Sequence, residues 1–296
     1  MNEQTAFNNY YQSNTSSLNS SEIVLKALEE FDAFVLQLRQ AGVEVNVFQD
    51  SESPSTPDAL FPNNWMSFHA NGTVALYPMF AENRRKERRM DIFDSLKKEG
   101  FEISEFIDFS SSEEDEKYME GTGSLVLDRK NKIAYAALSE RTHREIVEMV
   151  CQKLGFRPVL FTALQTVASK RLPIYHTNVM MSIGNELAMI CLECIDDLYE
   201  RESLKGSLIQ SGKSIIELSE AQINAFAGNM QQLKSKSGKD LIVMSSQAYK
   251  SLKADQIFKI ESKASIVHSP LYLIEELGGG SARCMIAENF LPKRIK

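Results

Sequence analysis

Hydrophobic and polar positions along the chain alternate between helical and extended spacing. Residues 20–40 place apolar side chains three and four positions apart, begin with a serine and stop before Gly42, which predicts a helix. Residues 43–48 alternate with a period of two, which predicts a strand. The same criteria predict helices at 84–99, 142–154, 198–212 and 245–252, and strands at 73–77, 101–106, 124–128, 132–137, 174–184, 186–191, 241–244 and 281–287.

These elements indicate a mixed α/β fold with frequent hairpins. A doubly wound parallel sheet would instead show a regular alternation of strands and helices. No linker rich in proline or glycine interrupts the 296 residues, so we expect a single domain at 1–296. With 43% hydrophobic residues, the chain has enough apolar material for a sizeable core.

Charge and composition exclude several classes of partner. The net charge of −7 argues against binding to nucleic acid or to an anionic membrane, and the basic run at 84–89 is too short to change that expectation. No apolar run reaches the roughly 20 residues that span a bilayer. Residues 1–21 lack the basic and apolar regions of a signal peptide. The four cysteines are therefore expected to be reduced thiols in the cytoplasm.

Three residues could carry chemistry, although each has an ordinary structural interpretation. Cys284 follows three glycines at 278–280, whose free amides would suit a nucleophile, but a cysteine on an apolar strand is more often part of the core. His176 begins an apolar strand and could act as a general acid and base, or be a structural histidine. Glu120 precedes a Gly-x-Gly turn and could orient a histidine, bind a substrate nitrogen, or be a solvated turn residue.

The segment 58–65, Asp-Ala-Leu-Phe-Pro-Asn-Asn-Trp, contains the only tryptophan. Its adjacent Asn63 and Asn64 offer donors and acceptors that suit a neutral amide or urea group, with an Asn-Asn turn as the alternative. Cys191 and Cys194 have the spacing of metal ligands but lack further ligands, so we interpret them as structural thiols. No metal is expected. The acidic run at 108–116 is typical of an exposed loop.

Several stretches in order along the chain resemble the guanidine-modifying (pentein) enzymes, which include arginine deiminase, dimethylarginine dimethylaminohydrolase, succinylarginine dihydrolase and the amidinotransferases. The resemblance is closest to an amidinotransferase-related branch of citrulline-utilising hydrolases. It is carried by NEQTA at 2–6, FPNNW at 61–65, PMFAENRR at 78–85, EGTGS at 120–124, LSERT at 138–142, HTNV at 176–179, FAGN at 226–229 and GGGSARC at 278–284. So many collinear stretches favour the functional interpretations of Cys284 and His176.

The resemblance implies a five-bladed β/α propeller around a polar channel. It implies a nucleophile at Cys284, a general acid and base at His176, and Glu120 as the partner of that histidine or a ligand for a substrate nitrogen. The implied substrate-binding residues are Asp58, which would face a substrate nitrogen, and Arg141 with either Arg85 or Arg84, which would hold the α-carboxylate. Relatives usually carry an apolar strand before the stretch at 2–6, so one module is expected to lack a strand.

The expected substrate follows from two departures from the family. Guanidinium-specific relatives carry acids at the positions of Asn64 and Asn178, and without these counterions a neutral ureido group is favoured. We therefore expect hydrolysis of citrulline to ornithine, ammonia and carbon dioxide, without a cofactor. Succinylarginine dihydrolase also uses asparagine near its guanidine. Alternatives therefore include hydrolysis of arginine or methylarginine, amidino transfer and a non-catalytic binding protein, and the sequence is compatible with a homo-oligomer.

Overall fold

A computed structural model describes residues 2–13, 18–50 and 53–294 of the chain. The α-helices are α1 Glu3–Ala6, α2 Ser20–Gln40, α3 Glu82–Arg85, α4 Asp91–Lys98, α5 Gly121–Ser124, α6 Arg144–Leu154, α7 Thr177–Met180, α8 Leu198–Gln210, α9 Glu220–Asn224, α10 Ser246–Ser251, α11 Ala254–Glu261 and α12 Tyr272–Gly278. Short 3₁₀ helices are η1 Pro62–Asn64, η2 Ser110–Asp115 and η3 Leu192–Cys194. No described helix is long and apolar enough to cross a membrane.

The strands form small mixed sheets rather than one large sheet. They are β1 Met66–Phe68, β2 Thr73–Leu76, β3 Glu105–Asp108, β4 Val126–Asp128, β5 Ile133–Ala137, β6 Arg157–Phe161, β7 Leu164–Val167, β8 Lys170–Pro173, β9 Met181–Ile183, β10 Leu187–Ile190, β11 Ser214–Glu217, β12 Gln231–Lys234, β13 Asp240–Ser245 and β14 Ser265–Ser269. Within the described residues they make four three-stranded sheets and the β7–β8 hairpin.

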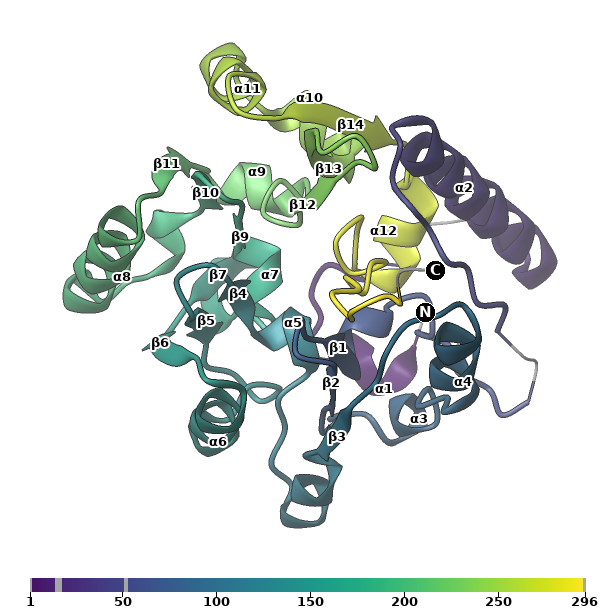
Figure 1. The fold of residues 1–296 in the computed structure, drawn as a ribbon. Coiled ribbons are helices and arrows are strands. Elements are labelled where there is room, and N and C mark those ends of the chain that lie inside the picture. The colour runs from purple at the N-terminus through teal and green to yellow at the C-terminus, as the bar shows by residue number, and fades with distance from the viewer. Residues whose placement is uncertain (1, 14–17, 51–52, 295–296) are drawn as a thin grey trace.

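The three-stranded sheets repeat one topology. In each, the first two strands are antiparallel and the third lies parallel to the middle strand, which it reaches through one or two helices. The connecting helices are α3 with α4, α6, α8, and α10 with α11. Figure 1 shows the sheets set around the middle of the molecule, with α2, α6, α8 and α11 on its outside. This arrangement is a mixed α/β fold, as the hydrophobic pattern predicts.

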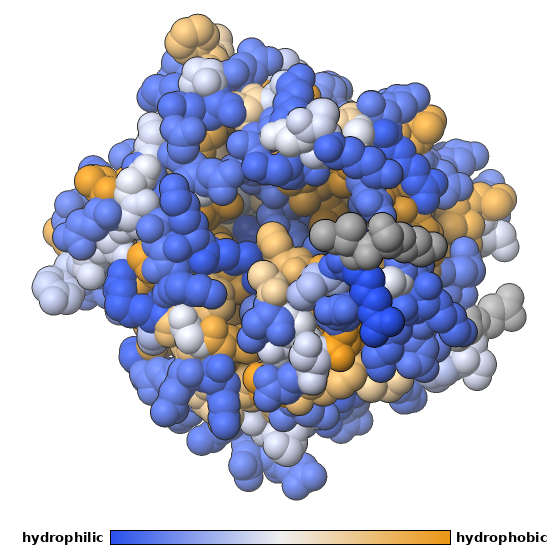
Figure 2. Space-filling model, viewed as in Figure 1, coloured by the Kyte–Doolittle hydropathy of each residue, from blue (hydrophilic) through white to orange (hydrophobic). Residues whose placement is uncertain are grey.

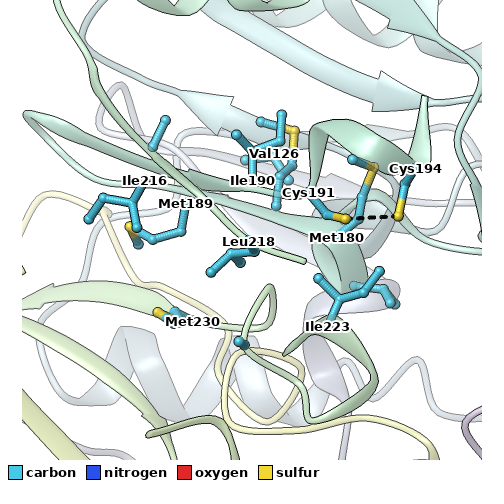
Figure 3. Packing of buried hydrophobic residues seen from close by; sticks show 14 of the residues in the cluster. Val126, Met180, Met189, Ile190, Cys191, Cys194, Ile216, Leu218, Ile223 and Met230 are labelled. Atoms are coloured by element: carbon cyan, nitrogen blue, oxygen red, sulfur yellow. Dashed lines mark hydrogen bonds between the residues drawn. The ribbon is translucent and has the colours of Figure 1, made fainter. Parts of the chain in front are cut away.

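The largest apolar cluster packs β9, β10 and β11 against neighbouring elements (Figure 3). Cys191 and Cys194 lie at its edge as buried free thiols, with their sulfur atoms 3.1 Å apart. Among the described residues, no group of histidine, cysteine and acidic side chains could hold a metal ion. Both cysteines are buried among the apolar side chains of this cluster, where a thiol packs as a small hydrophobic group.

Tertiary contacts modify several predicted elements. Helix α2 has the predicted bounds, but the helix predicted at 84–99 is divided into α3 and α4. Between them, Arg88 donates to the carbonyl of Tyr77 and Arg89 to that of Gln49, so the chain turns toward groups outside the helix. The strand predicted at 174–184 is interrupted by α7, since Thr177 donates to the carbonyl of Ser124 and accepts from the amide of Ala137.

Two predicted strands, 43–48 and 281–287, are not strands in the structure. Neither pairs with a neighbouring strand in the described chain, and residues 281–286 instead turn through bonds such as that from the Met285 amide to the Ser281 carbonyl. Both segments line an apolar groove of about 1160 Å³ beside α2. Figure 2 shows apolar side chains in a hollow near the middle of the face it presents. Alternation predicted extended backbone here, but a strand also needs a partner.

The acidic run at 108–116 is more ordered than an exposed loop. It forms η2, in which Glu113 makes ion pairs with Arg85 and Arg88 and accepts the amide of Met79. This acid therefore joins the run to the segment before α3 that leads into the site.

Candidate active site

Segments from distant parts of the sequence enclose one small polar cavity. Its volume is about 10 Å³, which is roughly the space of one water molecule. The lining residues are Thr5, Asn9, Asp58, Phe61, Asn64, Arg84, Arg141, Tyr175, His176, Gly278, Gly279, Gly280 and Cys284. Most of the site residues predicted from the sequence therefore meet at one place.

His176 lines this cavity and forms a buried pair with Glu120, which lies outside the cavity lining. His176 immediately precedes α7 and Glu120 immediately precedes α5, and their Nε2 and Oε2 atoms are 2.7 Å apart. Gly123 permits this approach, because a Cβ atom there would lie 2.8 Å from Nδ1 of the histidine and 2.5 Å from Nδ2 of Asn64. The Gly-x-Gly turn thus brings the carboxylate, the imidazole and an amide together.

The electrostatic surroundings give this pair a definite protonation state. Burial alone would raise the pKa of Glu120, but Arg141 and His176 together hold it below its usual range. Burial lowers the pKa of His176 to about 4, although Glu120 opposes that effect. At neutral pH the carboxylate is ionised and the ring is neutral, with its proton on Nε2 facing Glu120. Nδ1 is then the nitrogen that can accept a proton.

Cys284 lies in a turn, 4% exposed, and its sulfur meets two side-chain amides. Nδ2 of Asn178 is 3.4 Å from Sγ and Nδ2 of Asn229 is 3.2 Å from it. The backbone amide of Cys284 donates to Oδ1 of Asn229 at 3.4 Å. Of the glycine amides expected to be free for an adduct, that of Gly279 donates to the carbonyl of Glu275 at 3.0 Å.

Asn229 is the site residue that sequence reasoning missed. It ends the stretch Phe226-Ala-Gly-Asn, which belongs to the resemblance but suggested no role. Its contacts with Cys284 join positions 55 residues apart. The one sequence feature that could have indicated a role for Asn229 was its place in a stretch that belongs to the family resemblance.

Arg84, and not Arg85, lines the cavity. The Arg84 guanidinium is buried, binds Glu87 through Nε at 2.9 Å and donates from Nη1 to Oδ1 of Asn64 at 2.8 Å. Burial opposes its charge, but Glu87 and Asp58 raise the pKa of Arg84 above its usual value, so it stays protonated. The sequence left open which of the two arginines faces the site; Arg85 lies outside the cavity lining and donates to the carbonyl of Met79.

Arg141 lies against the ring of Tyr175, with 4.8 Å between the guanidinium carbon and the ring centroid. Its Nη1 is 3.6 Å from Glu120, and its other nitrogens donate to the carbonyl of Thr5 and to Oδ1 of Asn8. N-terminal residues therefore bind the donors expected to hold a carboxylate.

The Asp58 carboxylate is also bound by N-terminal residues. Its Oδ2 accepts from Nδ2 of Asn2 at 2.8 Å and from the hydroxyl of Thr5 at 3.3 Å. Residues 2–9, with the turn of α1, thus cover the polar groups on this side of the cavity.

The remaining predicted asparagines differ in position. Asn64 lines the cavity, whereas Asn63 lies outside the cavity lining and accepts from Nδ2 of Asn64 at 3.1 Å. Asn178 is fully buried beside Cys284, and its Oδ1 has no hydrogen-bond partner. Asn178 does not line the cavity, and its unpaired acceptor lies in the buried layer next to the thiol.

Comparison with known families adds to this geometry. Residues 1–291 match the family described as N,N dimethylarginine dimethylhydrolase, eukaryotic. The chain belongs to this family. It is thereby a member of the guanidine-modifying superfamily. No curated protein gives a significant match.

Solved structures share the fold at low sequence identity. The apo structure of ArgZ, a cyanobacterial arginine dihydrolase, superposes with a TM-score of 0.66 at 17% identity over 88% of this chain and 37% of that one. The N-terminal domain of ArgZ, covalently bound to a reaction intermediate, gives 0.66 at 18% identity over 90% and 88%. A dimethylarginine dimethylaminohydrolase adduct with S-methyl-L-thiocitrulline gives 0.59 at 15% over 88% and 87%. The chain thus spans about a third of full-length ArgZ.

Proposed function

We propose that this chain hydrolyses a C–N bond of a ureido or guanidino amino acid through a covalent intermediate on Cys284, with citrulline as the substrate. The observation that carries the proposal is the meeting of a thiol, an imidazole–carboxylate pair and two guanidinium groups at one enclosed cavity. A thiol and a base that line one cavity suit nucleophilic catalysis. The guanidinium groups suit the carboxylate of an amino acid.

The steps follow from the protonation states. Nδ1 of His176 takes the thiol proton while Sγ of Cys284 attacks the ureido carbon, and the ionised Glu120 stabilises the imidazolium that forms. The imidazolium returns that proton to the departing nitrogen, so ornithine leaves and an S-carbamoyl group stays on the sulfur. The neutral histidine then activates water, which releases carbamic acid and regenerates the thiol. Carbamic acid decomposes to ammonia and carbon dioxide.

Substrate binding requires the N-terminal segment, residues 2–9, to move. Arg141 and Arg84 would grip the α-carboxylate and Asp58 the α-amino group, but Thr5, Asn2 and Asn8 now bind two of these three residues. A cavity with room for one water cannot hold an amino acid. We infer that residues 2–9 move away as substrate enters and that the substrate replaces their hydrogen bonds.

Asn64 and Asn178 support a neutral ureido group, because a buried guanidinium would lack the counterions that acids at these positions provide. The family match, and the ionised Glu120 beside the cavity, favour a second candidate, arginine or a methylated arginine. In that case ammonia or the methylated amine would leave, the rest of the substrate would stay on the sulfur as a thiouronium, and water would release citrulline and regenerate the thiol.

We also propose that the fold is a five-bladed propeller. The repeated strand–strand–helix–strand modules would supply four blades. The fifth would combine α12, residues 281–290, α2 and 43–48, around the apolar groove. A cytoplasmic location would suit a chain whose four cysteines are free thiols.

Substrate choice is tested by measuring kcat/KM and products for citrulline, arginine and ω-methylated arginines. We expect citrulline to be preferred over arginine by roughly 30- to 1000-fold, which corresponds to about 2–4 kcal/mol for a buried cation without its counterion. Equal values, or a preference for arginine, would contradict the citrulline assignment and favour the second candidate. Adding an amine acceptor separates hydrolysis from amidino transfer.

The nucleophile is tested with Cys284→Ser. Turnover should fall by several orders of magnitude while the fold persists, and mass spectrometry should detect the substrate-derived adduct only on the wild-type thiol. Cys151→Ser is the matched control, because Cys151 is a buried free thiol in a different cluster. Near-normal activity in Cys284→Ser would exclude the covalent mechanism.

A further inference from the structure

The side-chain amide of Asn229 uses all of its hydrogen-bonding capacity around Cys284. Oδ1 accepts the backbone amides of Arg283 at 3.1 Å and Cys284 at 3.4 Å. Nδ2 donates to the carbonyl of Asn178 at 3.0 Å and lies 3.2 Å from Sγ of Cys284. Exchanging the two ends would set the oxygen against a carbonyl and the NH₂ against two N–H donors, so this orientation is required.

The backbone brings this amide to the sulfur through a tight turn after α9. Phe226 has a φ of 62°, and a Cβ on Gly228 would lie 2.1 Å from the carbonyl oxygen of Val179. Only a glycine lets the turn press this closely against α7. Asn229 is 1% exposed and does not line the cavity, so it reaches the thiol from behind and not from the substrate side.

We propose that Asn229 is a positioning residue, which fixes the Cys284 turn through its oxygen and stabilises the thiolate through its N–H. The proposal rests on the proposed function, in which Cys284 is the nucleophile. A hydrogen bond to an anion is about twice as strong as one between neutral groups, so the N–H favours the thiolate over the thiol. Asn178 supplies a second N–H at 3.4 Å.

Other charged groups near the sulfur do not replace this donor. The titratable and charged groups around Sγ are His176, Tyr175, Asp58, Arg84 and Arg141 on the cavity wall, with Arg283 next in sequence. Both cavity arginines are paired with acids, Arg84 with Glu87 and Arg141 with Glu120. The two asparagine amides are the side-chain donors within hydrogen-bond distance of Sγ among the described residues.

The test is the pH dependence of Cys284 alkylation by iodoacetamide in Asn229→Asp, without substrate, with the labelled peptide quantified by mass spectrometry. Aspartate keeps an oxygen for the two backbone amides but replaces the N–H donor with an oxygen that can carry charge, so Asn229→Ser, which adds no charge, is measured beside it. We expect the pH midpoint of alkylation to rise by at least about one unit, so that about tenfold less thiolate forms at a given pH below it. With substrate, kcat should fall while KM changes little, because Asn229 does not line the cavity.

Gln165→Glu is the matched control, since it also changes a buried amide to an acid but lies outside the cavity lining. It should leave the midpoint unchanged. If Asn229→Asp does not fold, Asn229→Ser retains a short acceptor without reach to the sulfur and should also raise the midpoint. A folded Asn229 variant with the wild-type alkylation profile would overturn the proposal.

Failure of the proposed function has a different signature. The alkylation profile is measured without substrate, so a shifted midpoint in a protein that turns over no ureido or guanidino compound would reject the activity but keep the role of Asn229. Normal citrulline turnover with an unshifted midpoint would reject only the role of Asn229.

Discussion

At the scale of single residues, burial and pairing act in opposite directions on neighbouring groups of the site. Glu120 stays ionised because Arg141 and His176 outweigh its burial, whereas His176 is neutral because burial outweighs Glu120. Two groups with opposed protonation preferences at hydrogen-bond distance are a usual acid–base arrangement. The same burial effect on histidine is found away from the site.

His69 provides a pH test that does not disturb the site. Burial, aided by Arg129 and Lys132, lowers the pKa of His69 to about 4, whereas an unfolded histidine titrates near 6.5. Between pH 4 and pH 6.5 the unfolded chain binds more protons at this histidine than the folded chain does. The stability that neutral His69 contributes is therefore present above pH 6.5 and is lost as the pH falls toward 4. For a histidine with its pKa lowered in this way, the free energy of unfolding should fall by about 2 kcal/mol between pH 7.5 and pH 5.

Urea denaturation of the wild type and His69→Gln at both pH values checks this prediction. Glutamine can keep the contact with Oγ of Ser67, which lies 2.9 Å from Nε2 of the histidine. The difference between the two pH values should be smaller in the variant by about 2 kcal/mol. An unchanged pH dependence would show that His69 is not held neutral.

At the scale of elements, short turns carry the functional groups and helices support them. α5 and α7 each span one turn and bring Glu120 and His176 together, while the turn after α9 carries Asn229. Short elements gain little from internal hydrogen bonds, so packing must hold them. The glycines in these turns are therefore sites where one added methyl group should matter.

Gly228→Ala should destabilise the protein by about 1–3 kcal/mol, since the new Cβ would meet the backbone of Val179 and Met180, which cannot yield as a flexible side chain could. Gly206→Ala in α8 is the control. Its Cβ meets nothing within 4 Å, and alanine in a helix interior should raise stability by up to about 1 kcal/mol. Thermal and urea unfolding of both variants give the comparison, and equal effects would show that the close contact at Gly228 relaxes.

At the scale of the whole molecule, the cavity is closed by both ends of the described chain. Residues 2–9 bind Arg141 and Asp58, while Asn9 also donates to the carbonyl of Gly279 next to the Cys284 turn. Access to the thiol therefore depends on how firmly the N-terminal segment is held.

Asn8→Ala should open the cavity more often, because Arg141 loses the acceptor that now binds its Nε and Nη2. We expect iodoacetamide to label Cys284 several-fold faster at pH 7.5, with little change in thermal stability. Glu3→Ala is the control within the same segment, since Glu3 is exposed and lies outside the cavity lining. Equal labelling rates in Asn8→Ala, Glu3→Ala and the wild type would exclude this segment as a cover.

The local pattern of apolar and polar residues was enough to predict the elements whose start, end and apolar face are all set by their own residues. α2 has an amphipathic face and a stop before Gly42, although its cap is Asn19 and not the serine that the sequence suggested, and the hairpin of β4 and β5 contains both strands and its turn. The mixed α/β class and the candidate residues Cys284, His176 and Glu120 also came from the sequence. The elements and the fold class depend on neighbours a few positions away, so no knowledge of distant segments is needed. The candidate residues, by contrast, were favoured only by the resemblance over many collinear stretches.

Tertiary structure alone decided what depends on partners far along the chain. Residues 43–48 alternate like a strand but pair with none, and Arg84 rather than Arg85 lines the cavity because Glu87 and Asn64 bind it there. The contact of Asn229 with Cys284 joins positions 55 residues apart. The spacing of apolar residues indicates which face of an element is buried. A hydrogen bond between distant residues depends instead on how all the elements pack together, and that packing brings these groups to one cavity.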